Sequence, residues 1–184
     1  MGYHTDFHGQ FKVTPTLTDE HKTYLKMFAE TRRMKRNEEK AEEFLDPVRN
    51  MVALPIGIDG AFFVGGGGFA GQDHDDSIID YNKPPGSQPG LWCHWEPTED
   101  GQYIEWNGSE KFYEYIEWLN YIIENFLQPW GYKLNGEVEW FGEDREDMGK
   151  IIVSDNEIGV LQGRIVYEDP DEAFDQAQGG SLLP

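Results

Sequence analysis

The apolar residues between positions 107 and 128 recur every three or four residues, which is the spacing of one face of an α-helix. Asn107 can cap the first turn, Glu110 can complete a capping box, and Pro129 places the end near residue 128. We therefore predict a long amphipathic helix whose apolar face packs on a sheet. That face comprises Phe112, Tyr115, Ile116, Leu119, Ile122, Ile123 and Phe126.

Elsewhere, apolar and polar positions alternate as they do in half-buried strands. A first strand is predicted from Tyr3 to Thr14 with a bulge at Gly9, and Thr18 is predicted to cap a first helix that begins at Asp19. Asp155-Asn156-Glu157 indicates a tight turn between two strands. Further strands are predicted at 61–64, in a hairpin over 91–106, and at 132–141, 150–154 and 158–167.

This order of elements predicts an α+β fold, in which an antiparallel sheet of about five to six strands carries two helices packed on one face. One domain is expected to span residues 1–168. Within it, the Gly/Asp/Pro-rich segment 37–90 is expected to be irregular or mobile, and residues 169–184 are expected to form a flexible acidic tail.

The composition adds a formal net charge of −20 and a pI near 4.4. Such a field repels nucleic acid and membrane surfaces, and it favours a partner protein with a basic surface. Solubility alone is the other explanation of the charge, and it stays open. Because the chain has one cysteine and no apolar stretch of membrane-spanning length, we expect a cytoplasmic protein without membrane contact or direct nucleic-acid binding.

Two acidic runs are candidate partner-binding surfaces. The first comprises Asp73, Asp75 and Asp76, and the second comprises Glu143, Asp144, Glu146 and Asp147. The run from Asp73 to Asp80 also offers hard oxygen ligands for a cation, but its spacing does not match an EF-hand loop. We therefore assign no metal ligand and predict no cofactor.

A basic cluster and a Gly-rich run suggest an alternative function, which is binding or hydrolysis of a nucleotide or another small ligand. The glycines formally match a dinucleotide fingerprint, but no helical pattern follows them to hold a pyrophosphate. The alternative requires the basic cluster, the Gly-rich run and the Asp73–Asp80 segment to meet in one pocket. The candidate contact residues are Arg32, Arg33, Lys35, Arg36, Gly66 and Gly68.

Cys93 and His94 carry the chemistry of a thiol–imidazole pair. Neighbouring residues of a strand face opposite sides, however, so we interpret Cys93 as a small buried residue. No other pattern singles out catalytic residues among the abundant carboxylates. We therefore predict a protein that is not an enzyme.

The segments MGYHTDF, LWCHW, EKFYEYIEWLNYIIENFLQPWGYKLNGEVEW and GKIIVSDN resemble a family of small acidic proteins of bacteriophages, prophages and actinobacteria. The resemblance covers most of the chain except the Gly/Asp-rich middle and the tail. It implies a cytosolic accessory protein, within the host cytoplasm if phage-encoded, and supplies no catalytic residue. With the charge, it predicts an inhibitor of a host nucleic-acid-handling defence protein, anti-restriction or anti-CRISPR-like, with nucleic-acid mimicry as one route. The oligomeric state is left open.

Overall fold

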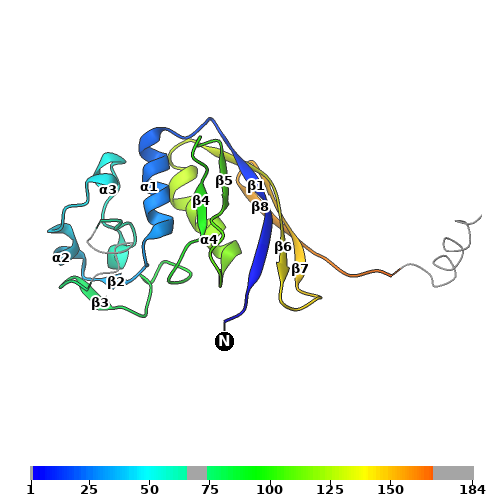
Figure 1. Ribbon diagram of the computed structural model, residues 1–184. Coiled ribbons are helices and arrows are strands. Elements are labelled where there is room, and N and C mark those ends of the chain that lie inside the picture. Colours follow the sequence, from blue (N-terminus) through cyan, green and yellow to red (C-terminus); the bar gives the residue numbers. More distant parts are fainter. Residues whose placement is uncertain (1, 66–73, 168–184) are drawn as a thin grey trace, which may run out of the picture.

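The computed structural model describes residues 2–65 and 74–167, which include a six-stranded antiparallel sheet (Figure 1). Its strand order is β4-β5-β1-β6-β7-β8, and all neighbouring strands are antiparallel. The predicted antiparallel sheet and the α+β class are confirmed. The strands are β1 Thr5–Thr14, β4 Trp95–Pro97, β5 Tyr103–Trp106, β6 Lys133–Gly142, β7 Met148–Ser154 and β8 Glu157–Gln162.

Strands β1 and β6 form the centre of the sheet and pair without a break in register, from Thr5 opposite Gly142 to Thr14 opposite Lys133. The bulge predicted at Gly9 is therefore wrong. Gly9 has a φ of 112°, and a Cβ atom at this position would collide with the Glu137 carbonyl oxygen. Glycine is needed because the two backbones approach closely in a conformation that residues with a Cβ rarely adopt.

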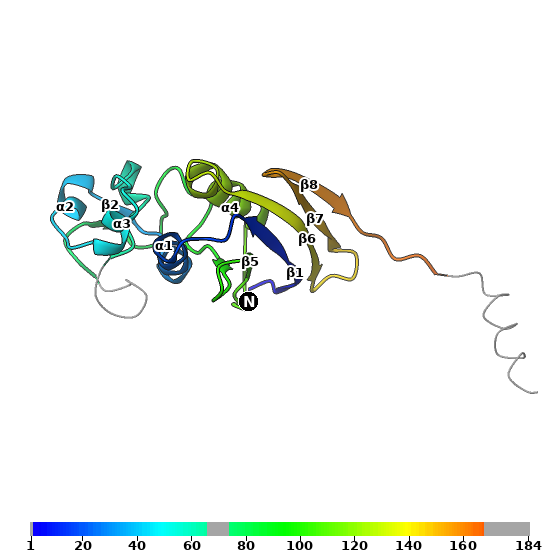
Figure 2. The same ribbon diagram turned by 90° about the horizontal axis from the view of Figure 1, so that it is seen from above.

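Helices α1 Asp19–Glu30 and α4 Tyr115–Ile122 lie on the same side of the sheet, and α4 continues as the π-helical turn η3 Ile123–Leu127 (Figures 1 and 2). Inward residues of the strands and the apolar faces of the helices form one core. None of the helices in the described ranges is long and apolar enough to cross a membrane. Fully buried members of the core include Phe11, Phe28, Trp118, Leu119, Phe126, Leu134 and Val138.

Helix α4 begins at Tyr115, so the predicted start near Asn107 is wrong. The Asn107 side chain accepts a hydrogen bond from the Ser109 backbone N–H at 3.0 Å and so closes a local turn instead of capping the helix. Two non-glycine residues in left-handed conformations, Lys111 with φ 61° and Glu114 with φ 53°, then separate this turn from α4. The preceding residues therefore form a loop, although Asn107 and Glu110 match the capping pattern.

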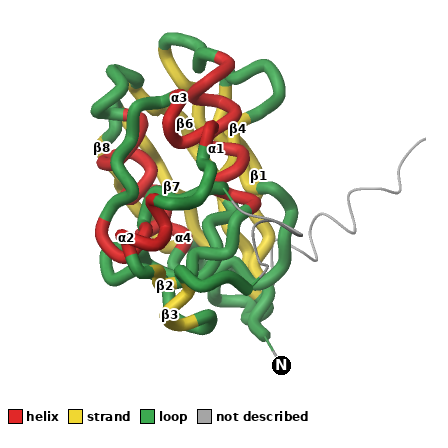
Figure 3. The backbone as a smooth tube through the Cα atoms, turned by 90° about the vertical axis from the view of Figure 1, so that its left-hand side faces the viewer, coloured by secondary structure: helices red, strands yellow, loops and turns green. Residues whose placement is uncertain are grey.

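The described parts of segment 32–90 form a small lobe beside α1, and Figure 3 shows α2 and α3 in front of the sheet. This segment is thus not wholly irregular. Arg32 to Arg36 follow the end of α1 and enter the lobe. The elements of the lobe are β2 Lys35–Arg36, α2 Glu38–Glu42, α3 Pro47–Met51, η1 Ile58–Gly60 and β3 Ile78–Asp80.

The strand predicted at 61–64 is not formed, because consecutive turns replace it. Asp59 and Gly60 have φ values of 54° and 76°, and the Phe63 N–H donates to the Gly60 carbonyl oxygen at 3.1 Å. Phe63 and Val64 are nonetheless buried. The apolar run therefore indicated burial rather than strand pairing, an ambiguity that short apolar runs share.

Candidate binding site

Two loops, residues 89–94 and 110–114, border a cavity of about 580 Å³, open to solvent, beside the start of α4. Its walls combine aromatic, acidic and basic side chains. We call this cavity the aromatic pocket; the chemically distinctive residues of its lining are Trp92, His94, Tyr113, Glu110, Lys111 and Glu114. Ligand pockets of proteins have a similar size and a similar mixture of apolar walls and few polar groups.

The 110–114 loop is held in place by Phe112, which lies between the two left-handed residues Lys111 and Glu114. Phe112 is buried, and its ring centroid lies 5.7 Å from that of Phe7 and 5.3 Å from that of Trp95. Left-handed conformations of residues other than glycine cost about 1–3 kcal/mol each and persist where packing imposes them. The core thus fixes the acidic wall of the aromatic pocket.

His94 gives the opposite wall a neutral imidazole. Its ring lies nearly parallel to that of Trp92, with an interplanar angle of 9° and centroids 6.2 Å apart, and its Nδ1 lies 3.4 Å from Asn107 Nδ2. Burial lowers the pKa of His94 to about 4. Near neutral pH this side chain therefore adds no positive charge to the aromatic pocket.

Trp118 places an unused hydrogen-bond donor behind the same wall. The residue is fully buried, and its indole Nε1 has no hydrogen-bond partner among the described residues. A Cβ atom at Gly90, which lines the aromatic pocket, would lie 3.5 Å from this nitrogen. Trp118 itself does not line the pocket, and Gly90 lies between the indole N–H and the pocket's other lining residues. Buried indole N–H groups usually have an acceptor.

Four exposed carboxylates follow the outer side of α4 from the aromatic pocket onwards. We call Glu110, Glu114, Glu117 and Glu124 the acidic stripe. Within residues 2–65 and 74–167, none of the four forms an ion pair. Glu117 and Glu124 border a second hollow of about 440 Å³, which lies between α4 and the edge strand β8. Glu110 and Glu114 thus line one cavity, and Glu117 and Glu124 line the other.

The predicted cluster Glu143, Asp144, Glu146 and Asp147 lies in the turn between β6 and β7. Part of it has a structural role. Asp147 accepts hydrogen bonds from the Tyr3 hydroxyl at 2.6 Å and from Trp140 Nε1 at 3.0 Å, and Glu143 accepts one from the His4 backbone N–H at 2.9 Å. The bond to Asp147 raises the pKa of Tyr3. Partner binding by this cluster stays a prediction.

The other predicted acidic cluster lies in the small lobe, at the opposite end of the molecule from the β6–β7 turn (Figures 1 and 2). Asp75 forms an ion pair with Arg36 at 2.8 Å, whereas Asp76 is exposed. Burial acts to raise the pKa of Asp75, but hydrogen bonds from Ser77 and Arg36 outweigh it and lower the pKa. Asp73 lies outside the described residues. The two predicted clusters therefore do not form one surface.

The basic cluster is engaged inside the small lobe. The buried Arg33 guanidinium donates to the Ala61 carbonyl oxygen at 2.8 Å and to the Gln88 side chain at 3.2 Å. Arg32 donates to the Tyr81 carbonyl oxygen, and Lys35 forms an ion pair with Asp59 at 3.5 Å.

Strand pairing of β2 with β3 brings Lys35 and Arg36 beside the segment from Asp75 to Asp80. Two of the three segments of the nucleotide hypothesis thus meet. Gly66 and Gly68 lie outside the described residues. In the Arg36–Asp75 ion pair, one basic and one acidic side chain of the proposed nucleotide site bind each other. The nucleotide hypothesis stays a prediction.

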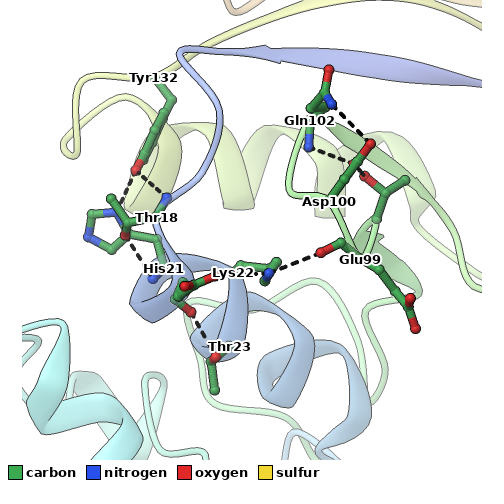
Figure 4. Close-up of polar contacts among 10 residues, drawn as sticks. Thr18, His21, Lys22, Thr23, Glu99, Asp100, Gln102 and Tyr132 are labelled. Atoms are coloured by element: carbon green, nitrogen blue, oxygen red, sulfur yellow. Dashed lines mark hydrogen bonds and ion pairs between the residues drawn. The ribbon is translucent and has the colours of Figure 1, made fainter.

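At the N-terminus of α1, polar side chains bind one another (Figure 4). The Tyr132 hydroxyl accepts a hydrogen bond from the Thr18 backbone N–H at 3.2 Å and lies 2.8 Å from His21 Nδ1. The His21 ring stacks on Trp130 with centroids 4.0 Å apart, and burial lowers the pKa of His21. Because Lys22 is also bound, to the Glu99 carbonyl oxygen, we assign this network a structural role.

Cys93 is buried, as predicted, and burial raises the pKa of its thiol to about 12. Its Sγ lies 3.8 Å from the Trp95 carbonyl oxygen, whereas His94 lines the aromatic pocket. Over the described residues, no three His, Cys, Asp or Glu side chains are placed to hold a metal ion together.

Sequence reasoning missed the aromatic pocket and the acidic stripe. The signal for the stripe was present, because Glu117 and Glu124 are seven residues apart and so share a helix face opposite the apolar one. No sequence pattern joins the 89–94 loop to the 110–114 loop. Comparison of the chain with family models, with curated proteins and with solved structures found no match.

Proposed function

We propose that the protein is a non-enzymatic acidic interaction protein, which binds a basic nucleic-acid-handling protein through the acidic stripe and inhibits it. In the phage setting that the sequence resemblance implies, this partner is a host defence protein of the restriction or CRISPR type. The observation that carries the proposal is the set of four exposed carboxylates on and before α4, which have no ion pair within the described ranges.

The electrostatics of the stripe favour a basic partner. Like charges on one helix face repel one another, and a cationic surface removes this repulsion. The net charge of −20 extends the attraction beyond contact distance and accelerates encounter with basic proteins. Lys and Arg side chains that normally contact phosphates are the natural counterpart, because they make up nucleic-acid-binding surfaces.

The spacing of the carboxylates in the acidic stripe fits a general charge complementarity to a basic surface better than it fits an imitation of the phosphates of a DNA duplex. Residues 114 to 124 span about 15 Å at 1.5 Å per helical residue. A DNA strand carries one charge per about 3.4 Å of axis, so a strand of this length has about four charges. Glu114, which precedes α4, and Glu117 and Glu124, which follow along α4 and η3, offer three carboxylates over about the same distance. We therefore propose that the stripe covers the basic surface without reproducing the phosphate pattern.

The nucleotide alternative has less support from the described residues. Arg33 and Arg36 are buried, and their guanidinium groups donate to groups of the small lobe. Arg33 Nη1 and Arg36 Nη2 have no hydrogen-bond partner among the described residues, but both side chains are buried, and a nucleotide phosphate would meet a strongly negative field. Thermal-shift measurements with ATP and with GTP test the alternative directly. A rise in Tm with either nucleotide would favour it over the interaction protein.

The proposal is tested by the capture of basic proteins on the tagged full-length chain, followed by displacement with double-stranded DNA. We expect a basic nucleic-acid-binding protein to be retained and then released by DNA, because both ligands occupy the same surface. Glu117→Gln/Glu124→Gln should weaken retention at least tenfold. Inhibition of the purified partner in its own nucleic-acid-binding assay completes the test.

The matched control is Glu39→Gln/Glu42→Gln, which removes the same charge from exposed positions of α2 in the small lobe. It should leave retention within twofold of the unaltered chain. Equal losses in the two double variants would show that only net charge matters. Such a result, or the absence of any DNA-displaced basic protein, would contradict binding through the acidic stripe.

A further inference from the structure

In the described part of the chain, the six-stranded sheet has one open edge, at β8. The strand at the other edge, β4, is three residues long, ends at Pro97 and contacts helix α1. Short edge strands, proline and a covering helix all limit pairing with further strands. Strand β8 has six residues and no proline, and within residues 2–65 and 74–167 it pairs with β7 alone. Figure 2 shows β8 at the margin of the sheet, with the following residues leading away from it.

The backbone groups of β8 face alternately toward β7 and away from the sheet. The Gly163 N–H donates to the Met148 carbonyl oxygen at 2.8 Å, and these two residues continue the β7–β8 register. Every second residue before Gly163 therefore also faces β7, and the N–H and C=O groups of Ile158, Val160 and Gln162 point outward. Among the described residues, these outward groups have no backbone partner. Such a row is a template for one more strand.

The helix-facing side of this edge is the hollow of about 440 Å³ between α4 and β8. Ile158 and Val160 line it from the strand, and Ile116, Glu117 and Glu124 line it from α4 and η3. The described lining thus combines apolar side chains with two carboxylates and contains no Lys or Arg. A side chain that fills this hollow needs an apolar stem and a cationic end, which Lys and Arg both have.

We propose, building on the proposed function, that the basic partner adds an extended segment to β8 as a seventh strand of the sheet. On the helix-facing side, its Lys or Arg side chains lie along Val160 and reach Glu117 and Glu124. Successive residues of a strand point to opposite faces. The residues between the basic ones therefore lie on the other face of the sheet, where Leu161 is exposed and apolar side chains fit. The segment thus alternates basic and apolar residues.

Charge decides between this occupant and a second copy of the chain. Strand β8 contains one carboxylate, Glu157, and no Lys or Arg. A second β8 would therefore leave Glu117 and Glu124 without a cation. It would also bring together two chains that each carry a net charge of −20. A basic segment supplies the missing backbone partners and removes the repulsion among the carboxylates at the same time.

The test is residue-resolved amide hydrogen exchange of the ¹⁵N-labelled full-length chain by NMR. The probe is the acetylated and amidated peptide Val-Lys-Val-Arg-Val-Lys-Val. We expect the amide protons of Ile158 and Val160 to exchange fast in the free protein and at least tenfold more slowly at saturation with the peptide, because strand addition gives each an acceptor. Electrostatic attraction alone forms no such hydrogen bond and would leave these exchange rates unchanged.

Two altered peptides separate backbone pairing from charge. The peptide with every backbone amide N-methylated keeps its charge but donates no backbone hydrogen bond, so it should leave both exchange rates within twofold of those in the free protein. The peptide with Gln in place of each Lys and Arg keeps its backbone donors and loses its charge, so it should bind at least tenfold more weakly. Equal binding of the charged and the Gln peptides would overturn the assignment to a basic segment.

Variants of the protein test the same two contributions. Val160→Pro removes one outward N–H at an edge position, where a sheet tolerates proline, and should weaken peptide binding at least tenfold. Val160→Thr keeps the N–H and the branched side chain and should bind within threefold of the unaltered chain. Glu117→Gln/Glu124→Gln should weaken binding at least fivefold, whereas Glu39→Gln/Glu42→Gln should leave it unchanged. Unchanged amide signals outside the altered elements verify the fold of each variant.

Unchanged exchange of Ile158 and Val160 at saturation would overturn the proposal. A dimer of the free chain in light scattering, with both amides already protected, would also overturn it, because a second copy would then occupy the edge.

The capture experiment gives results that are separate from these. If Val160→Pro retains a DNA-displaced basic protein as well as the unaltered chain does, and the peptide leaves both amides unprotected, the proposed function stands and strand addition falls. If no such protein is retained while the peptide protects Ile158 and Val160, the proposed function falls and the assignment of the β8 edge stands.

Discussion

Among single residues, His94 is expected to couple stability to pH. Its pKa in the folded protein is about 4, below the ordinary value of 6.5, because burial disfavours the charged ring. The unfolded chain therefore takes up a proton first as the pH falls from 6.5 to 4, and the folded state loses about 3 kcal/mol across that range. Below pH 4 both states are protonated, and this loss stops increasing.

Urea unfolding of the unaltered chain and of His94→Gln at pH 7 and pH 4.5 measures this coupling. The stability difference between the two proteins should change by about 2–3 kcal/mol in favour of the variant at the lower pH. Taking the difference cancels the effect of the carboxylates, which titrate in both proteins. His8→Gln, at an exposed position, is the control. If the stability difference between His94→Gln and the unaltered chain is the same at both pH values, burial does not lower the pKa of His94.

At the scale of elements, the β7–β8 turn fastens the end of the sheet. Asn156 accepts a hydrogen bond from the Leu134 N–H at 2.6 Å and donates one to the Tyr132 carbonyl oxygen at 2.9 Å. Both Asp155 and Asn156 have positive φ, of 49° and 75°, as the predicted tight turn requires. The turn of one hairpin therefore also fixes the start of β6.

We expect Asn156→Gly to destabilise the protein by about 1–3 kcal/mol, because glycine keeps the backbone conformation but loses both hydrogen bonds. Asp155→Gly is the matched change. Within the described part of the chain, the one contact recorded for its side chain is an exposed ion pair with Lys133 at 3.4 Å, so relief of the positive φ should leave stability unchanged or slightly higher. Chemical denaturation measures both. Equal losses of stability in the two variants would show that the conformational freedom of glycine causes the destabilisation, rather than the loss of the Asn156 side-chain hydrogen bonds.

Periodicity in the sequence predicts the regular elements well, and the reasons are local. The alternation in β1 and the Thr18 cap of α1 both appear in the structure, where the Thr18 side chain accepts the His21 N–H. The start of α4 could not be predicted in this way. Asn107 satisfies a nearer N–H at Ser109, and burial of Phe112 imposes left-handed residues before Tyr115.

The small lobe and the aromatic pocket depend on contacts between distant segments. Helices α2 and α3 have five residues each, too few to display a helical period. Buried arginines hold the lobe together, although charged runs more often form solvated faces. The candidate site likewise arises only after folding has brought the 89–94 loop beside the 110–114 loop. Asp and Glu residues are abundant throughout the sequence. Their number therefore could not show which carboxylates lack an ion pair in the structure.

For the whole molecule, the net charge of −20 should make stability depend on ionic strength. Repulsion among carboxylates opposes the compact state, and salt screens it as the Debye length falls from about 30 Å at 0.01 M to about 8 Å at 0.15 M. We expect Tm to rise by about 2–4 °C over this range, which corresponds to about 1 kcal/mol for a chain of this size.

Differential scanning calorimetry in sodium chloride and in choline chloride checks this expectation. Equal rises in the two salts would identify screening as the cause, whereas a rise only with sodium would indicate specific cation binding. A Tm that falls with salt would mean that favourable ion pairs outweigh repulsion at the surface. The exposed pairs of Lys150 with Glu137 and Glu139 are the attractive contacts that such a result would implicate.

The burial of Cys93 gives the molecule a built-in reporter of its own opening. It is the single thiol of the chain, it is fully buried, and its pKa of about 12 leaves almost no reactive thiolate in the folded state. An alkylating reagent can therefore modify the protein only when the core around β4 becomes accessible. The rate of modification measures how often this occurs, without any added label or substitution.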